Sequence, residues 1–466
     1  MTRAARWARL LTTERLGAPG EARDPERSPF EQDTGRVTFS SAFRRLQDKT
    51  QVFPLSKSDT TRTRLTHSLE VASIGRSLGE RAGRLLSAET LLPEGVSAQD
   101  VGAVVSAACL AHDVGNPPFG HSGEDAIRTW AARFLNAHPG LDLTLAERED
   151  FLRFEGNAQT FRIYARTQAR ERDGGLRLTL PTLGTLVKYP CPSTSCGPDA
   201  GHAYAKWGYV QADAPLAARV FAGLGLTRQS GERERYVRHP LVYLMEAADD
   251  ICYAVADLED AYRLGLIGLR ELLDVYANAA DLGGHAWEEG AGEDHAAFPA
   301  NRAARAKNRV IARLVDDTFD AFRAHLPEIE AGTFTSDLIH SIPEYAARYA
   351  PLKALARERG YESTRVLQIE LAGYRALGGL LDALADAFVT RPDGHDSRKL
   401  QQLVPEEFYV LSPTPYHEVL ARRARGRLLE HLSTYERLLT LTDYVSGMTD
   451  RYALETYQYL TGIKLP

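Results

Sequence analysis

The feature that most constrains this chain is a run of thirteen residues, 112–124, at the end of an apolar segment. The run holds two histidines and two carboxylates, namely His112, Asp113, His121 and Glu124. Residues 101–114 are rich in alanine and valine and apolar on most sides, which predicts a buried helix. Gly115 and the prolines at 117–118 end that helix, because proline cannot continue the ladder of hydrogen bonds. The run is therefore expected at a junction between helices, next to the core.

The residue types of this run suit hydrolysis at a metal ion. A divalent metal binds adjacent nitrogen and oxygen ligands, which His112 and Asp113 supply. A separate pair must handle protons, and His121 with Glu124, three residues later, fits that role at the start of a helix capped by Ser122. A lone histidine is more often a hydrogen-bonded interior residue. A His-Asp pair that ends an apolar helix is harder to explain by packing, since a buried aspartate needs a partner or an ion.

Two other predicted helices supply further candidate ligands. His67 lies in the segment 65–86, whose apolar residues recur at helical spacing, and Asp249 lies in the segment 240–264. Mixed histidine and carboxylate ligands suit Mn, Fe, Co, Ni or Zn, and suit Mg less well. Segments that converge on one ion in this way would leave coordination positions open for water or substrate, as catalysis requires.

A stripe of side chains continues from Asp249 along its helix. Asp249, Tyr253 and Asp257 are spaced four residues apart and therefore lie on one face. Beside a metal, such a stripe predicts a row that grips a substrate through a ligand, a stacking ring and a hydroxyl acceptor. The alternative is a solvated helix face, which is the usual outcome for an arbitrary stripe of this kind.

The rest of the chain is predicted to be almost entirely helical, with no repeat and no clear linker. Further helices are expected at 143–171, 303–326, 364–390, 415–441 and 444–460. The alternation of apolar and polar residues at 176–180 makes that segment the best strand candidate. We therefore expect an all-α fold with at most a small β-hairpin. It would form a single unit over 1–466, with a catalytic core at 36–265 and a helical C-terminal region at 266–466.

Composition and charge narrow the class of protein. The net charge is −6, so the chain as a whole lacks the basic footprint of a nucleic-acid-binding protein. No stretch reaches the roughly 18 apolar residues of a membrane span, and the N-terminus lacks the apolar region of a secretory signal. Four cysteines in 466 residues indicate a reducing compartment. We expect a cytoplasmic protein without membrane contacts.

Five stretches, in the same order along the chain, resemble the dGTP triphosphohydrolase family of the HD superfamily of metal-dependent phosphohydrolases. They are KTQV at 49–52, RTRLTHSLEV at 62–71, HDVGNPPFGHSGE at 112–124, LVKYP at 186–190 and EAADDICYAVADLEDA at 246–261. The HD pair alone is a weak signal, whereas the two long motifs together are very specific. The resemblance is dense up to residue 265 and thinner afterwards.

The resemblance implies an HD-domain helical fold with additional C-terminal helices. It implies cleavage of dGTP between the 5′ oxygen and the α-phosphorus, which yields deoxyguanosine and inorganic tripolyphosphate and controls dNTP pools. One divalent metal ion, Mn²⁺ first and otherwise Mg²⁺, Co²⁺, Fe²⁺, Ni²⁺ or Zn²⁺, is implied at His67, His112, Asp113 and Asp249. Asp250 is the alternative fourth ligand, but Asp249 is favoured because the helix stripe begins there.

The same resemblance implies roles for the neighbouring residues. His121 is implied to act on the in-line water or on the leaving 5′ oxygen, with Glu124 orienting its imidazole. The phosphates are implied to contact Arg64, Lys188 and Tyr189. Because a triphosphate carries roughly four negative charges, the site needs local cations even in an acidic protein.

Contacts to the sugar are implied in the same way. Gln51 and Asp257 would hydrogen-bond the 3′-hydroxyl, and Val52 would lie beside the substrate. Tyr253 would lie against C2′ and leave no room for a 2′-hydroxyl, so the site would select deoxyribose.

Contacts to the base and to other molecules are less constrained. The resemblance implies base contacts at Tyr361 and Glu370, although Glu370 is equally explained as an ordinary helix or interface residue. The arginine-rich run at 422–427 suits base stacking, an oligomer interface or single-stranded DNA, but a solvated basic face is commoner. A homo-oligomer, first of all a hexamer, is also implied.

Two other functions remain open. One is a broad dNTP triphosphohydrolase that a nucleotide activates at a separate site. The other is a regulatory protein that binds nucleotides or single-stranded DNA and retains only vestigial catalysis. The intact ligand set and the pair of His121 and Glu124 argue against the second. Other HD activities, such as phosphodiesterase, would not need the sugar stripe of Tyr253 and Asp257.

Overall fold

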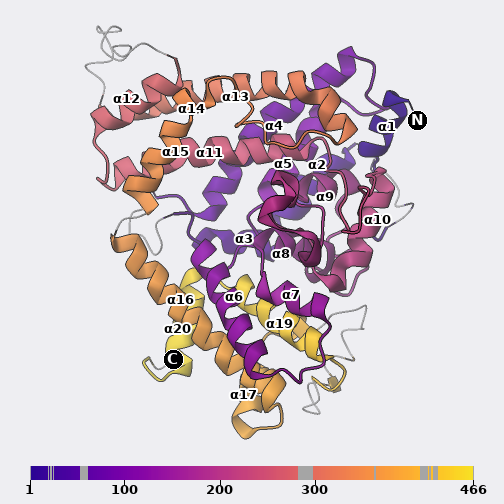
Figure 1. The fold of residues 1–466 in the computed structure, drawn as a ribbon, viewed down its shortest axis with the longest axis vertical. Coiled ribbons are helices and arrows are strands. Elements are labelled where there is room, and N and C mark those ends of the chain that lie inside the picture. The colour runs from indigo at the N-terminus through magenta and orange to yellow at the C-terminus, as the bar shows by residue number, and fades with distance from the viewer. Residues whose placement is uncertain are drawn as a thin grey trace.

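The computed structural model describes residues 2–18, 20, 24, 26–52, 61–281, 298–361, 364–409, 418, 421–422 and 429–464. The first half of the chain forms α1 (Arg3–Leu10), α2 (Pro29–Thr38), α3 (Ser41–Arg45), α4 (Arg64–Ala88), α5 (Ala98–Ala111), α6 (Gly120–Ala137), α7 (Leu145–Leu152), α8 (Gly156–Arg162), α9 (Leu180–Leu186), α10 (Ala214–Leu224) and α11 (Val242–Arg263). The second half forms α12 (Leu269–Ala279), α13 (Pro299–Ala331), α14 (Tyr345–Arg348), α15 (Ala350–Ala356), α16 (Thr364–Ala385), α17 (His395–Leu403), α19 (Thr434–Gly447) and α20 (Asp450–Leu460). Within these residues only isolated β-bridges occur, so the predicted all-α class is confirmed (Figure 1). None of the described helices has the length and apolarity to cross a membrane.

The helices gather around two separate hydrophobic clusters. The first cluster contains most of the N-terminal helices together with α11, α12 and α13. The second joins α6 and α7 to helices near the end of the chain, namely α16, α19 and α20. In Figure 1 the second group, which includes α6, lies below the first. The thirteen-residue run, 112–124, therefore connects the two clusters.

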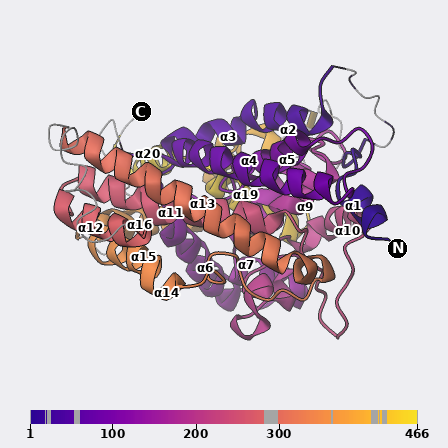
Figure 2. The same cartoon turned by 90° about the horizontal axis from the view of Figure 1, so that it is seen from above.

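Close packing of α4 against α5 brings two predicted ligands together. The two helices lie side by side (Figure 2), with glycines of α4 facing α5. A Cβ at Gly79 would lie 2.9 Å from the Cα of Gly102, and one at Gly75 would lie 2.4 Å from the sulfur of Cys109. Only glycine permits this approach. Because the helices run antiparallel, the start of α4 meets the end of α5, where the His-Asp pair lies.

Two predicted elements in the middle of the chain differ from the structure. The segment 176–180 forms no strand, because Thr179 makes only an isolated bridge to Arg15 and its side chain caps α9 instead. The predicted helix at 143–171 is divided into α7 and α8. Glu155 breaks it, since its side chain caps the new helix by accepting from the Asn157 amide.

Two predicted helix boundaries are also wrong. Ser122 does not cap α6, which begins at Gly120 after Phe119, a residue in the left-handed conformation. The Ser122 hydroxyl donates instead to the Glu370 carbonyl, at 3.1 Å. The boundary predicted between the helices at 415–441 and 444–460 lies later in the chain than expected, because α19 continues to Gly447 and α20 begins at Asp450. Part of the first lies outside the described residues.

Candidate metal centre and active-site pocket

The predicted metal ligands meet at one point between α4, α5 and α11. Suitable ligand atoms of His67, His112 and Asp113 all lie within 4.8 Å of one another. Asp249 reaches the same place, with Oδ1 at 3.0 Å from His67 Nε2 and 3.4 Å from His112 Nε2. Asp250 instead accepts a hydrogen bond from a lysine of α15 at 2.9 Å. Of the two aspartates, only Asp249 faces the histidines.

The chemistry of this cluster fits a divalent metal. Nδ1 of His112 donates to the Cys109 carbonyl at 2.6 Å, which turns Nε2 toward Asp113 and Asp249, 3.6 and 3.4 Å away. Burial alone would lower the pKa of His112, but the two aspartates outweigh it and raise the pKa to about 9. The carboxylates of Asp113 and Asp249 around two imidazoles form the mixed donor set that borderline divalent metals prefer.

The carboxylate of Asp113 is held at both oxygens. Arg64 Nη1 donates to Oδ2 at 2.7 Å, and the Asn116 side-chain amide donates to Oδ1. Arg64 is buried, yet it also lines the neighbouring cavity. Arg64 therefore holds the candidate ligand Asp113 in place, and it also lies where the sequence predicted a contact to phosphate.

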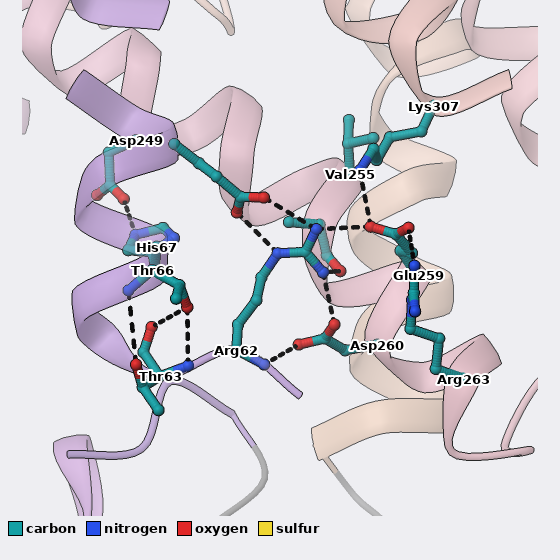
Figure 3. A network of polar contacts seen from close by, with 12 residues as sticks. Arg62, Thr63, Thr66, His67, Asp249, Val255, Glu259, Asp260, Arg263 and Lys307 are labelled. Carbon is teal, nitrogen blue, oxygen red and sulfur yellow. Dashed lines mark hydrogen bonds and ion pairs between the residues drawn. The ribbon is translucent and has the colours of Figure 1, made fainter. Parts of the chain in front are cut away.

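A second arginine ties together the helices that carry the candidate ligands (Figure 3). Arg62 donates through Nε to Glu70 of α4 at 2.7 Å, through Nη2 to Glu259 at 2.6 Å and through Nη1 to Asp260 at 2.5 Å. Glu259 and Asp260 belong to α11, and Arg62 lies just before α4 begins. These contacts fix the end of α4 that bears His67 against the helix that bears the Asp249 stripe.

The predicted proton-handling pair also forms. Nδ1 of His121 lies 2.9 Å from Oε2 of Glu124, while Oε1 of Glu124 accepts from the Gly156 amide at 2.8 Å. Burial raises the pKa of Glu124, but the hydrogen bond from His121 and the charges of Lys206 and Arg128 lower it to about 2. An ionised Glu124 accepts the proton on Nδ1 and leaves Nε2 on the open edge of the imidazole.

A cavity of about 180 Å³ joins these groups. Nine of the predicted site residues line it, namely Gln51, Arg64, His112, Asp113, His121, Lys188, Tyr189, Asp249 and Tyr253. Sequence analysis missed five other polar residues of its lining, namely Asn116, Glu155, Asn157, Lys206 and Glu246. His112, Asp113 and His121, which come from both halves of the run at 112–124, thus line one cavity.

Two carboxylates of the cavity lining, Glu246 and Glu155, pair with cations. Glu246 is buried and accepts from Lys188 at 3.0 Å, from Arg238 at 2.8 Å and from His202 at 2.8 Å. Lys206 pairs with Glu155 in a similar way, at 3.4 Å. Glu246 lies inside a recognisable motif, so it was detectable, whereas Lys206 lies in a segment with no informative pattern.

The predicted sugar-binding residues divide into two groups. Gln51 and Tyr253 line the cavity, and the Tyr253 ring lies edge-on to His67, with centroids 6.4 Å apart. Val52 and Asp257 are buried and do not belong to the lining. The stripe on α11 therefore begins in the cavity and continues into the core.

Of the two predicted base-binding residues, Glu370 does not line the cavity. Glu370 is half-buried on α16, and burial raises the pKa of its carboxyl above the usual value although the charge of His121 acts in the other direction. The side chain of Tyr361 lies outside the described residues, as do most of the arginine-rich run at 422–427 and most of the insertion at 283–300. Cys191 and Cys196 are buried free thiols, each hydrogen-bonded to a backbone carbonyl.

Comparison with known proteins gives a consistent result. Residues 64–170 match the HD domain family. The chain is 37% identical to a deoxyguanosinetriphosphate triphosphohydrolase-like protein of Synechocystis sp., covering 98% of this chain and all of the relative. A protein of the same name from Pseudomonas aeruginosa is 38% identical over 99% of both chains. A deoxyguanosinetriphosphate triphosphohydrolase of Salmonella arizonae is 33% identical over 93% of this chain and 94% of its own.

Proposed function

This chain belongs to the deoxyguanosinetriphosphate triphosphohydrolase family of HD-domain hydrolases, and on that premise we propose that it cleaves dGTP to deoxyguanosine and inorganic tripolyphosphate. HD domains are metal-dependent, so the fit of the His-Asp cluster to a divalent ion accords with this family. One observation carries the proposal. His121, which is paired with Glu124, lines the same cavity as His112, Asp113, Asp249 and Tyr253.

His121 is the residue that moves a proton in this proposal. The reaction forms a bond between water oxygen and the α-phosphorus and breaks the bond to the 5′ oxygen. Water loses a proton and the 5′ oxygen gains one, and Nε2 of His121 exchanges the proton at one of these two atoms. Glu124 keeps Nδ1 protonated and the ring oriented throughout.

Other residues bind and orient the substrate. Lys188, Tyr189 and Arg64 would contact the phosphates, and Lys206 joins them as a cation that the sequence did not reveal. Gln51 would hydrogen-bond the 3′-hydroxyl.

Sugar and base selection complete the assignment. Tyr253 would exclude a 2′-hydroxyl by occupying the space beside C2′. Asp257, Val52, Tyr361 and Glu370 remain part of the proposed binding set for sugar and base. The C-terminal region, 266–466, would contribute to the base pocket and to oligomer contacts.

A bound metal ion would polarise the α-phosphate and lower the pKa of water. His67, His112, Asp113 and Asp249 would hold it. We propose Mn²⁺ for this ion, a hexameric homo-oligomer, and action in the cytoplasm. The free thiols of the described cysteines fit a reducing compartment. The arginine-rich run, 422–427, is the candidate contact for a single-stranded DNA effector.

Product analysis tests the reaction. Purified protein is incubated with each dNTP and with GTP, in the presence of Mn²⁺, Mg²⁺ or Co²⁺, and free nucleoside and tripolyphosphate are measured. The proposal expects tripolyphosphate from dGTP and none from GTP. His121→Ala should lower kcat by about 10²–10⁴-fold, because general acid–base catalysis contributes that much.

A matched control separates this loss from a general effect of removing a His-Glu pair. His325 and Glu328 on α13 form a pair with the same spacing and a 3.1 Å contact, away from the cavity. His325→Ala should retain full activity. Turnover of all four dNTPs would widen the substrate class. Orthophosphate or pyrophosphate as product would refute the mechanism, and DNA binding without turnover would favour a regulatory protein.

A further inference from the structure

One buried carboxylate reaches two loops of the pocket from near the end of the chain. Asp450, the first residue of α20, is 1% exposed. Its Oδ1 accepts from the Phe119 amide at 2.9 Å, and its Oδ2 accepts from the Thr50 amide at 3.0 Å. Thr50 directly precedes Gln51, and Phe119 lies two residues before His121. A single side chain therefore joins the loop of the predicted sugar contact to the loop of the predicted proton carrier.

The loop at Phe119 has an unusual backbone that needs such support. Phe119 has φ of +62° and Gly120 has φ of +58°, so two successive residues are left-handed just before His121. A bulky residue in this region is strained and persists only where its surroundings hold it. Asp450 holds the amide of Phe119, and Gly373 of α16 makes room for its ring. A Cβ at Gly373 would lie 2.4 Å from the ring carbon Cγ.

Lys49, which directly precedes Thr50, also connects these loops to the end of the chain. Nζ of Lys49 donates to the Asn116 carbonyl at 2.6 Å and to the Ser446 carbonyl at 2.8 Å. Ser446 and Asp450 lie on either side of the junction between α19 and α20. The junction thus contacts both loops. The Asp450 carboxylate accepts from one amide of each loop, and the Ser446 carbonyl accepts from Lys49.

We propose that Asp450 is a positioning residue, which holds the turn at Phe119 and so sets His121 in place across the cavity from Gln51. This inference rests on the proposed function, in which His121 moves a proton. The candidate metal ligands lie on α4, α11 and the end of α5. Arg62 hydrogen-bonds residues of α4 and α11, and Arg64 hydrogen-bonds Asp113, whereas Asp450 acts on Arg64 through its charge. Asp450 should therefore govern turnover and leave metal affinity unchanged.

The first test is Asp450→Asn in the full-length protein. Asparagine keeps the shape but turns an NH₂ group toward one of the two amides, so one hydrogen bond is lost. Hydrogen exchange should accelerate at whichever of the two amides, Thr50 or Phe119, faces the NH₂ group. The kcat should fall by about 10²-fold, the scale of a small misplacement of catalytic groups, while Mn²⁺ affinity stays within twofold.

The matched control is another buried aspartate of the second hydrophobic cluster. Asp150 accepts from the Gln211 amide at 2.8 Å and from the Tyr435 hydroxyl at 2.5 Å, away from the pocket. Asp150→Asn should lower the melting temperature without changing kcat well below it. A purely structural role for Asp450 would make the two variants alike and would overturn the proposal.

A second pair of variants tests the same turn without altering a charge. Gly373→Ala places a methyl group against the Phe119 ring, whereas Gly378→Ala, on the same helix, meets nothing within 4 Å. The first should lower kcat and accelerate exchange at Phe119, and the second should change neither. This pair decides the question if Asp450→Asn fails to fold.

The outcomes separate this inference from the proposed function. Unchanged exchange at Thr50 and Phe119 in Asp450→Asn, or accelerated exchange with normal kcat, overturns the role of Asp450. If wild-type protein releases no tripolyphosphate, the proposed function fails. The exchange rates of the variant then decide the question, because acceleration at either amide still supports the turn-holding role and its absence at both overturns that role.

Discussion

The two sides of the pocket are built in opposite ways. On the metal side, His67 and Asp249 project from long regular helices of the first hydrophobic cluster, and the His67 side chain is 1% exposed. On the other side, His121 follows a left-handed turn at the head of α6, in the second cluster, and its side chain is 76% exposed. The His67 side is enclosed and braced by Arg62 and Arg64. The His121 imidazole is open, with Glu124 at its Nδ1 and Asp450 at the backbone of the preceding turn.

The difference follows from what each side would do. Ligands of a metal gain from burial, because a low dielectric strengthens their interaction with the ion. A residue that transfers a proton must reach the substrate, so it needs an open edge and a fixed orientation. Glu124 supplies the orientation from the buried side while the imidazole stays accessible. The comparison predicts that variants on the two sides will separate metal binding from turnover.

The largest effect is expected from His112→Ala. Loss of an imidazole ligand should abolish tight Mn²⁺ binding and lower kcat/KM by about 10⁴-fold, since a metal supplies several kcal/mol of transition-state stabilisation. Calorimetric titration with Mn²⁺ and product assays measure both. His239→Ala is the control, because burial lowers the pKa of His239 to about 4 and its Nε2 binds the Leu10 carbonyl. It should lower the melting temperature only, and equal metal affinity in both variants would refute the metal site.

An intermediate effect is expected from Arg62→Lys. Lysine keeps the charge but cannot bridge Glu70, Glu259 and Asp260 together, so the start of α4 should loosen. Metal affinity should fall about 10-fold, as for loss of a contact that orients a ligand. Arg15→Lys, at a buried arginine that pairs with Asp33 far from the pocket, should cost stability without changing metal affinity. If both variants bind Mn²⁺ normally, Arg62 only stabilises the fold.

The smallest effect concerns the pH dependence of stability. The pKa of Glu124 is lowered to about 2 from a usual 4.5, so its contribution to folding is present above pH 4.5 and is lost as the pH falls toward 2. For Asp150, burial raises the pKa to about 6 from 3.8, so its contribution is present below pH 3.8 and is lost as the pH rises through about 6.

Two substitutions should reveal these opposite slopes. Glu124→Gln should remove part of the fall in unfolding free energy between pH 4.5 and 2, and Asp150→Asn part of the fall between 3.8 and 6. Each change should be about 1–3 kcal/mol, measured by urea denaturation across that range. Curves parallel to the wild type would contradict the assigned directions.

Sequence patterns predicted the helices best where periodicity is strong. The segments 65–86 and 240–264 correspond to α4 and α11 within two residues at each end. Predictions were wrong where side chains redirect the backbone. Glu155 starts a new helix inside 143–171, and Phe119 rather than Ser122 precedes α6. Local sequence does not predict a phenylalanine in the left-handed conformation. The residues that accommodate Phe119 there, Asp450 and Gly373, are distant in the sequence.

The sequence by itself determined the helical class, the donor chemistry of the run at 112–124 and the stripe on α11, because these depend on residue type and local periodicity. Only the tertiary structure decided which of Asp249 and Asp250 faces the histidines and which cations line the cavity. It also decided that Arg62 and Asp450 hold opposite sides of the pocket. Such contacts join residues up to 400 positions apart, and they depend on how packed helices meet rather than on any local pattern.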